Sequence, residues 1–188
     1  MEKVRSFISI DIEDPEIINK IVHIQREIEG LRVATVKYVE PENLHYTLWF
    51  LGEIPASLIE DVYRVMRDIK SEPFKLELRG VGAFPSISRP RVIWIGAGKG
   101  SDAMINIYRQ LEGGLRGLGF KPDKRGFTPH LTIGRVKSIS NAPLLHKKLM
   151  ELSDVEIGEV LVDRIRLKKS TLTPKGPIYT TLKEVRFS

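Results

Sequence analysis

The sequence predicts an α+β fold of two pseudo-symmetric lobes, each a mainly antiparallel sheet with helices on its outside. The main observation is that both halves of the 188-residue chain show one order of elements: strand, helix, His-x-Thr strand, helix, strand. The second observation is spacing, because the helix that follows each motif is expected 12 residues after its histidine. We therefore expect one two-lobed domain over residues 1–188, with sequence repeats at about residues 4–84 and 91–188.

Alternating apolar residues and helix caps define the elements of the first half. Residues of Val4–Ile12 alternate between two faces, as they do in a strand. Asp14 followed by Pro15 is typical of a helix start, and Gly30 of a helix end. The expected strands are Val4–Ile12, residues 31–39, Leu44–Leu51 and Phe74–Leu78, the helices are residues 14–30 and Ser57–Lys70, and residues 79–90 are expected to form a loop.

The second half follows the same order and ends in a hairpin. Gly119 is typical of a helix end, and the turn at residues 173–176 separates the last two strands. The expected strands are residues 91–97, His130–Val136, Val160–Leu172 and residues 178–187, and the expected helices are Ser101–Leu118 and Ala142–Leu152.

Composition is typical of a globular protein, with 41% hydrophobic and 29% charged residues. No apolar run approaches the ~20 residues that span a membrane, and no signal-peptide hydrophobic segment is visible, so we expect a cytoplasmic protein without membrane contact. The absence of cysteine excludes disulfides and thiolate chemistry. The net charge is +6, divided as −2 over residues 1–94 and +8 over residues 95–188. A basic half favours a polyanionic partner such as RNA or a nucleotide, and a merely basic surface is the alternative.

Two of the four histidines occupy matching four-residue motifs. The motifs are His45-Tyr46-Thr47-Leu48 and His130-Leu131-Thr132-Ile133. Alternate residues of a strand share a face, so each histidine should lie beside its threonine while the apolar residues face the core. One such pattern is weak evidence, but with eight threonines in the chain, chance rarely produces it twice. Pseudo-symmetry lets the two strands face each other across a groove, with two imidazoles and two hydroxyls around one small volume.

This set of groups suits phosphate-ester chemistry. With an imidazole pKa of about 6.5, one ring can accept a proton while the other, if charged, donates one. A threonine hydroxyl can donate to a non-bridging phosphate oxygen. Such chemistry requires no metal, cofactor or covalent intermediate. A zinc site is one alternative, although further ligands at zinc spacing do not accompany either histidine. A groove that binds nucleotides or RNA without turnover is another.

Several segments resemble one known family. RSFISIDI, HYTLWFLGE, GVGAFPS with RPRVIWIG, HLTIGRV and KSTLTPKGPIYTTL are similar to segments of the two-histidine phosphoesterase superfamily. Within it, nearly the whole chain resembles the RNA 2′,3′-cyclic phosphodiesterases, also called 2′-5′ RNA ligases. The resemblance implies a bilobal fold with the active groove between the lobes, and hydrolysis of RNA 2′,3′-cyclic phosphate ends to 2′-phosphomonoesters. It also implies reversible, ATP-independent ligation when an RNA 5′-hydroxyl replaces water, and it leaves the natural RNA open, transfer-RNA processing and repair included.

The resemblance assigns roles to the motif residues. His45 matches the family's proton donor and His130 its proton acceptor. Thr47 and Thr132 match the hydroxyls that hold the phosphate. Arg135 matches a basic residue after the second motif, although on an unbroken strand it would point away from His130. A bend would bring Arg135 to the phosphate, and a solvated strand end is the alternative.

Other residues are candidates for substrate contact. Arg5 and Phe7 share one face of the first strand, where Phe7 could stack on a base or pack in the core. Trp49 could face the groove with His45 and Thr47.

Basic residues outside the motifs are candidates for RNA binding. Lys168 shares a strand face with Arg164 and Arg166, which is expected either to follow a nucleic acid backbone or to be simply solvated. Lys124 and Arg125 lie in the loop before the second motif. A monomer is the simplest expectation.

Overall fold

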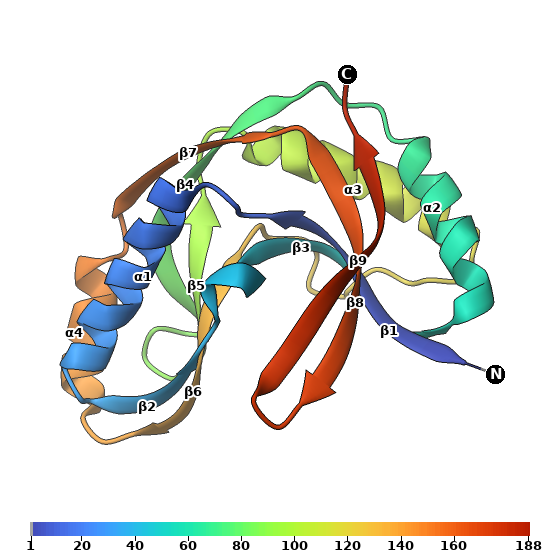
Figure 1. Cartoon of the computed structure of the whole chain (residues 1–188). Helices are drawn as coiled ribbons and strands as arrows, with labels where there is room; N and C mark the ends of the chain where they lie inside the picture. The colour runs from blue at the N-terminus through green and yellow to red at the C-terminus, as the bar shows by residue number, and fades with distance from the viewer. Residues whose placement is uncertain (1) are drawn as a thin grey trace.

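Nine strands form one continuous antiparallel sheet in the computed structural model, which describes residues 2–188 (Figure 1). The strand order is β7-β4-β5-β6-β3-β1-β8-β9, and β2 pairs with β6 beside this path. The strands are β1 Lys3–Asp11, β2 Ala34–Tyr38, β3 His45–Pro55, β4 Phe74–Pro85, β5 Pro90–Ala97, β6 Leu131–Ile139, β7 Glu156–Val162, β8 Arg164–Thr173 and β9 Gly176–Arg186. The helices are α1 Pro15–Gly30, α2 Ile59–Arg67, α3 Ser101–Arg116 and α4 Ala142–Glu151, with short 3₁₀ turns η1 Pro41–Asn43 and η2 Ala56–Leu58.

The sheet divides into two lobes where β3 meets β6. These strands pair at Tyr46 and Leu131, each the residue that follows a motif histidine. Lobe 1 consists of β3-β1-β8-β9, and lobe 2 consists of β6-β5-β4-β7 with β2 attached to β6. The predicted α+β fold of two antiparallel lobes is therefore confirmed.

The lobes exchange strands between the two halves of the sequence. β4 belongs to the first half but pairs with β5 and β7 of lobe 2. β8 and β9 belong to the second half, and β8 pairs with β1 of lobe 1. The chain crosses from lobe 2 to lobe 1 at Asp163, between β7 and β8. Each lobe is thus completed by strands from the other half.

The four helices of residues 2–188 cover the outside of the sheet in two pairs, on opposite sides in Figure 1. α1 packs against β2, β6 and β7, and the ammonium of Lys148 in α4 lies 2.9 Å from the Glu27 carboxylate of α1. α2 packs against α3, which also contacts β3 and β4. Asp14 caps α1 as predicted, since its carboxylate accepts hydrogen bonds from the backbone N–H groups of the first turn. No helix of the described residues is long and apolar enough to cross a membrane.

Two expected boundaries are wrong. Residues 79–90, expected to form a loop, lie largely in a hairpin, because β4 continues to Pro85 and β5 begins at Pro90. Gly80 has φ +78° at a register shift of β4, so this glycine marks a bulge within the strand instead of its end. The expected strand Val160–Leu172 is two strands, because its parts pair with different lobes.

Candidate active site

The two motifs line one groove with a volume of about 580 Å³. The motif side chains that face it are His45, Thr47, His130 and Thr132. Tyr46 and Leu131 are fully buried on the opposite face, and the Tyr46 hydroxyl donates a hydrogen bond to the Gly96 carbonyl at 2.8 Å. Alternation along each strand therefore places the polar residues of both motifs where the sequence pattern predicted them.

A bulge at the fourth position of each motif changes the alternation that follows. In β3, Thr47 pairs with Ser9 and Trp49 with Ile8, which leaves Leu48 without a partner in β1. In β6, Ile133 is skipped in the same way, because its neighbours Thr132 and Gly134 pair with consecutive residues of β5. A bulge adds one residue and moves the next side chains to the other face.

The bulges bring the fifth residue after each histidine back to the groove. These residues are Phe50 and Arg135, and both line it. The β6 bulge supplies the bend that Arg135 was expected to need. The expectation that Trp49 faces the groove is wrong, because Trp49 is buried and stacks on Tyr108 with ring centroids 5.4 Å apart. Phe50, with 54% of its surface exposed, takes that place.

Both imidazoles are fixed by the backbone in the same way. The Nδ1 atom of His45 lies 2.7 Å from the carbonyl oxygen of Asn43, and Nδ1 of His130 lies 2.8 Å from that of Thr128. A carbonyl oxygen can only accept, so each Nδ1 carries the hydrogen and donates it. The Nε2 atom of each ring is left for chemistry, and that of His45 lies 2.9 Å from the Thr47 hydroxyl.

The pairing of Tyr46 with Leu131 fixes how the two motifs face each other. Continued by one residue in each direction, this antiparallel register sets His45 across from Thr132 and Thr47 across from His130. The histidines are then diagonal neighbours, whose side chains in a regular pair start on the order of 7–8 Å apart. A phosphate between the four side chains would meet one imidazole on each side.

His45 and His130 have different surroundings. Asp11 pairs with His45 across β1 and β3. The register of β5 with β6, continued by one residue past the pair of Ile95 and Leu131, sets Gly96 across from His130. Burial lowers the pKa of His45, and the nearby Lys168 and His130 act in the same direction, while the Asn43 carbonyl and the Asp11 carboxylate partly oppose them. His130 instead lies edge-on to Phe84, with ring centroids 5.0 Å apart.

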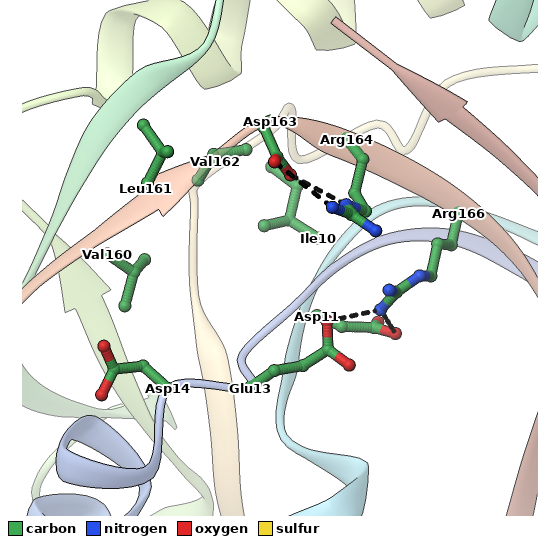
Figure 2. A pocket seen from close by; sticks show the side chains of 10 residues that line it. All are labelled: Ile10, Asp11, Glu13, Asp14, Val160, Leu161, Val162, Asp163, Arg164 and Arg166. Atoms are coloured by element: carbon green, nitrogen blue, oxygen red, sulfur yellow. Dashed lines mark hydrogen bonds and ion pairs between the residues drawn. The ribbon is translucent and has the colours of Figure 1, made fainter.

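Asp11 is the centre of a largely buried ion network. Its carboxylate accepts hydrogen bonds from Ser9 Oγ at 2.7 Å, Lys168 Nζ at 2.8 Å and Arg166 Nη1 at 2.9 Å. Burial acts to raise the pKa of Asp11, but the bonds from Lys168 and Ser9 outweigh it, and the pKa is lowered. Figure 2 shows the Arg166 guanidinium bonded to the carboxylates of both Asp11 and Glu13, at a smaller pocket of about 220 Å³.

The remaining substrate-contact candidates are divided between groove and surface. Arg5 and Phe7 line the groove. Only 4% of Phe7 is exposed, and its ring stacks on His45 with centroids 4.9 Å apart, so it mainly supports that imidazole. Lys124 and Arg125 lie in the exposed loop before β6, outside the groove lining, and Arg125 pairs with Asp123.

Lys168 is not among the groove-lining residues, and its strand face is not a free basic patch. Lys168 and Arg166 pair with Asp11, and Arg166 also pairs with Glu13 and Glu184. The third member of that face, Arg164, pairs with Asp163 (Figure 2). Carboxylates both adjacent and distant in the sequence therefore neutralise the charges that were expected to follow an RNA backbone.

Several groove residues were not predicted from the sequence. They come from β2, η1 and the β8–β9 hairpin, and they include Lys37, Tyr38, Asn43, Leu172 and Tyr179. Lys175, which belongs to the basic segment of residues 164–175 that the sequence offered for RNA binding, also lines the groove. Among residues 2–188, no ion pair involves the four groove cations, which are Arg5, Lys37, Arg135 and Lys175. The groove therefore presents unneutralised positive charge beside aromatic rings.

Two antiparallel lobes with an imidazole–hydroxyl pair from each define the class of two-histidine phosphoesterases. The LigT-like phosphoesterase family matches residues 10–94 and again residues 95–179, once in each half of the chain. The chain belongs to this family.

Curated relatives and solved structures agree with this assignment. An RNA 2′,3′-cyclic phosphodiesterase of Aeropyrum pernix is 46% identical over 151 residues, which is 80% of this chain and 86% of that protein. Its counterpart in Methanocaldococcus jannaschii is 40% identical and covers 96% of this chain and 99% of its own. A crystal structure from Thermus thermophilus has a TM-score of 0.81 at 28% identity, covering 97% of both chains. Escherichia coli LigT complexed with 3′-AMP has a TM-score of 0.79 at 25% identity, covering 100% of this chain and 99% of its own.

Proposed function

We propose that this phosphoesterase hydrolyses 2′,3′-cyclic phosphate ends of RNA to 2′-phosphomonoesters by metal-free acid–base catalysis. The observation that carries the proposal is the pair of imidazoles in one groove, each with Nδ1–H held by a backbone carbonyl and Nε2 beside a threonine or the open groove. The names of the Aeropyrum and Methanocaldococcus relatives support the substrate.

The proposed reaction moves two protons through the Nε2 atoms. Neutral His130 takes a proton from water as the water oxygen bonds to phosphorus. The bond from phosphorus to the 3′-oxygen breaks, and His45 gives its Nε2 proton to that oxygen. The products are a 2′-phosphomonoester and a 3′-hydroxyl, and proton exchange with solvent restores both rings. Because Nδ1–H of each ring remains on its carbonyl, the acid form of His45 is the imidazolium and the base form of His130 is neutral.

The polar groups of the groove would hold the phosphate during these steps. Thr47 and Thr132 can donate to the two non-bridging oxygens, where negative charge increases in the transition state. Arg135 reaches the same groove through the β6 bulge and adds a cation. These side chains together supply an acid, a base and an anion-binding site, which is the support for a metal-free route.

Substrate binding would also prepare His45 for its role as the acid. In the free protein, burial lowers the pKa of His45 and favours its neutral form. A bound phosphate places an anion beside the ring, which favours the imidazolium and raises the pKa. The proton donor would therefore be charged mainly when substrate is present.

Charge and aromatic groups of the groove support RNA as the wider substrate. The Arg5 guanidinium lies 4.9 Å above the centre of the Phe50 ring, and both side chains line the groove. An exposed ring beside cations is suited to stacking a base and holding its phosphate. E. coli LigT has been crystallised with 3′-AMP and with ATP, which supports nucleotides as a class of ligand for this chain.

The same site could join RNA ends without ATP. An RNA 5′-hydroxyl in place of water would attack the cyclic phosphate and form a 2′-5′ linkage, with the strained ring as the driving force. Water is far more concentrated than RNA ends, so we expect hydrolysis to dominate in dilute solution.

An oligonucleotide with a 2′,3′-cyclic phosphate end tests the proposal directly. We expect a 2′-phosphate product, unchanged activity in EDTA, and losses of at least about 100-fold for His45→Ala and for His130→Ala. A 3′-phosphate product would contradict the chemistry. A wild type that binds the oligonucleotide without turnover, with histidine variants that lose only affinity, would indicate the non-catalytic alternative.

A substrate with sulfur in place of the bridging 3′-oxygen distinguishes acid from base. A thiolate leaves without a proton, so this substrate should restore most of the activity of His45→Ala but none of that of His130→Ala. The opposite pattern would reverse the two roles.

A further inference from the structure

Asn43 connects the β8–β9 hairpin to His45. This residue ends η1, two positions before the histidine. Its backbone carbonyl accepts the hydrogen of His45 Nδ1 at 2.7 Å, and its side-chain amide donates to the carbonyl of Pro177 at 3.1 Å. One residue therefore fixes the ring through its main chain and holds the hairpin through its side chain.

The hairpin end forms part of the groove wall. Leu172, Lys175 and Pro177 lie at this end and line the groove, and 69% of the Leu172 surface is exposed. A second hydrogen bond also holds the hairpin end. It joins the Lys37 ammonium of β2 to the Lys175 carbonyl at 3.3 Å. A substrate in the groove would touch the same hairpin segment that Asn43 holds.

His130 provides a contrast within the same molecule. Its Nδ1 is held by the Thr128 carbonyl in the matching way, but among residues 2–188 no side-chain hydrogen bond joins Thr128 to another element. The link to a groove wall is therefore a property of His45 alone among the two imidazoles.

We infer that Asn43 is a positioning residue, which holds the Nε2 atom of His45 in place only while the β8–β9 hairpin is seated on η1. A substrate that presses the hairpin onto η1 then also aligns the proton donor, so binding and acid catalysis are coupled. The coupling to turnover rests on the proposed function, whereas the control of the His45 ring is a property of the free protein.

Two variants separate the two ends of this link. Asn43→Ala removes the amide donor. A shortened hairpin, in which Asn-Gly joins Thr171 to Ile178, removes the Pro177 acceptor and keeps Asn43. A two-residue turn can join Thr171 to Ile178 because these residues are direct partners in the β8–β9 register. Unfolding midpoints close to that of the wild type establish that each variant is folded.

The first measurement uses ¹⁵N NMR of the imidazole rings in the free protein. In the wild type we expect both neutral rings to carry hydrogen on Nδ1. Each variant should give a mixture of tautomers at His45 and leave His130 unchanged, which serves as the internal control. An unchanged His45 in either variant, or equal changes at both rings, would overturn the inference.

The second measurement is turnover of a nucleoside 2′,3′-cyclic phosphate. Asn43→Ala should lower kcat between about 10- and 100-fold with little change in KM, as expected for a misplaced catalytic group. The same substitution should cost nothing further in a His45→Ala background, and independent losses would contradict a role through His45. If the wild type does not turn over this substrate, the proposed function fails, while the NMR result still decides the role of Asn43.

Discussion

Removal of the Asp11 charge should strongly lower the free energy of unfolding of the protein. Asp11 is not one of the four motif side chains, so this prediction concerns stability. The side chains of Lys168 and Asp11 are each 12% exposed, and that of Arg166 is 13% exposed. In Asp11→Asn, Lys168 loses the one carboxylate with which it pairs among residues 2–188, whereas Arg166 keeps Glu13 and Glu184. The substitution therefore leaves one largely buried ammonium without an opposite charge.

The magnitude follows from this geometry. Breaking a buried ion pair by removing one partner costs about 3–5 kcal/mol, because the remaining charge stays desolvated. The asparagine oxygen can still accept a hydrogen bond, so we expect a loss near the lower limit, about 3 kcal/mol in the free energy of unfolding at pH 7. Because Lys168→Met removes the unpaired ammonium, the double variant should recover part of this loss.

The loss should depend on pH in a defined direction. The pKa of Asp11 in the folded protein is lowered from its ordinary value of 3.8. A lowered carboxyl pKa contributes stability that is fully present above pH 3.8 and is lost as the pH falls through the folded value. The difference between wild type and Asp11→Asn should therefore be constant near neutrality and decrease in acid.

Urea unfolding followed by circular dichroism measures both effects. The wild type, Asp11→Asn, Lys168→Met and the double variant should be compared at pH 7 and again below pH 3.8. A loss under about 1 kcal/mol for Asp11→Asn at pH 7 would place the network among weak surface pairs. A loss that stays the same in acid would refute the carboxylate as its source.

Two further predictions concern the groove. Because the pKa of His45 is lowered from 6.5 in the free protein, kcat/KM should fall with rising pH through a value below 6.5. The kcat value reports the substrate complex and should fall through a higher pH. If both quantities fell at the same pH in a pH-rate profile, bound phosphate would not be the cause of the shift. Phe50→Ala should raise KM for an oligonucleotide between about 5- and 150-fold and leave kcat unchanged, because stacking one base contributes about 1–3 kcal/mol. Steady-state kinetics measure this effect, with Phe50→Tyr as the control that keeps the ring. Equal behaviour of the two variants would count against a stacking role.

The sequence predicted the centre of the groove because its signals there are local. His45 and Thr47 share a face through strand alternation, and so do His130 and Thr132, so a repeated pattern was enough to find them. Alternation does not reveal a bulge, because an extra residue such as Leu48 looks the same in sequence as a regular core residue. The exchange of Trp49 for Phe50 at the groove follows from that single insertion.

Interactions between distant segments were outside the reach of sequence patterns. Lys168 and Asp11 are 157 positions apart, and nothing near Lys168 signals that its charge is already paired. Similarly, glycine and proline in residues 79–90 are typical of loops, but here they accompany a bulge and a hairpin of the sheet. Asn43 shows the same limit, because its role depends on a hairpin 134 positions away.

The strand exchange between lobes has a consequence for the integrity of the molecule. A cut between β4 and β5 would leave one fragment with β1 and β3 but without β8, and the other with β5 and β6 but without β4. Each fragment would expose the backbone N–H and C=O groups of a strand edge, which the other half of the chain covers in the intact protein. Each lobe therefore needs strands from both halves of the chain, so we expect neither half to fold to its native form without the other.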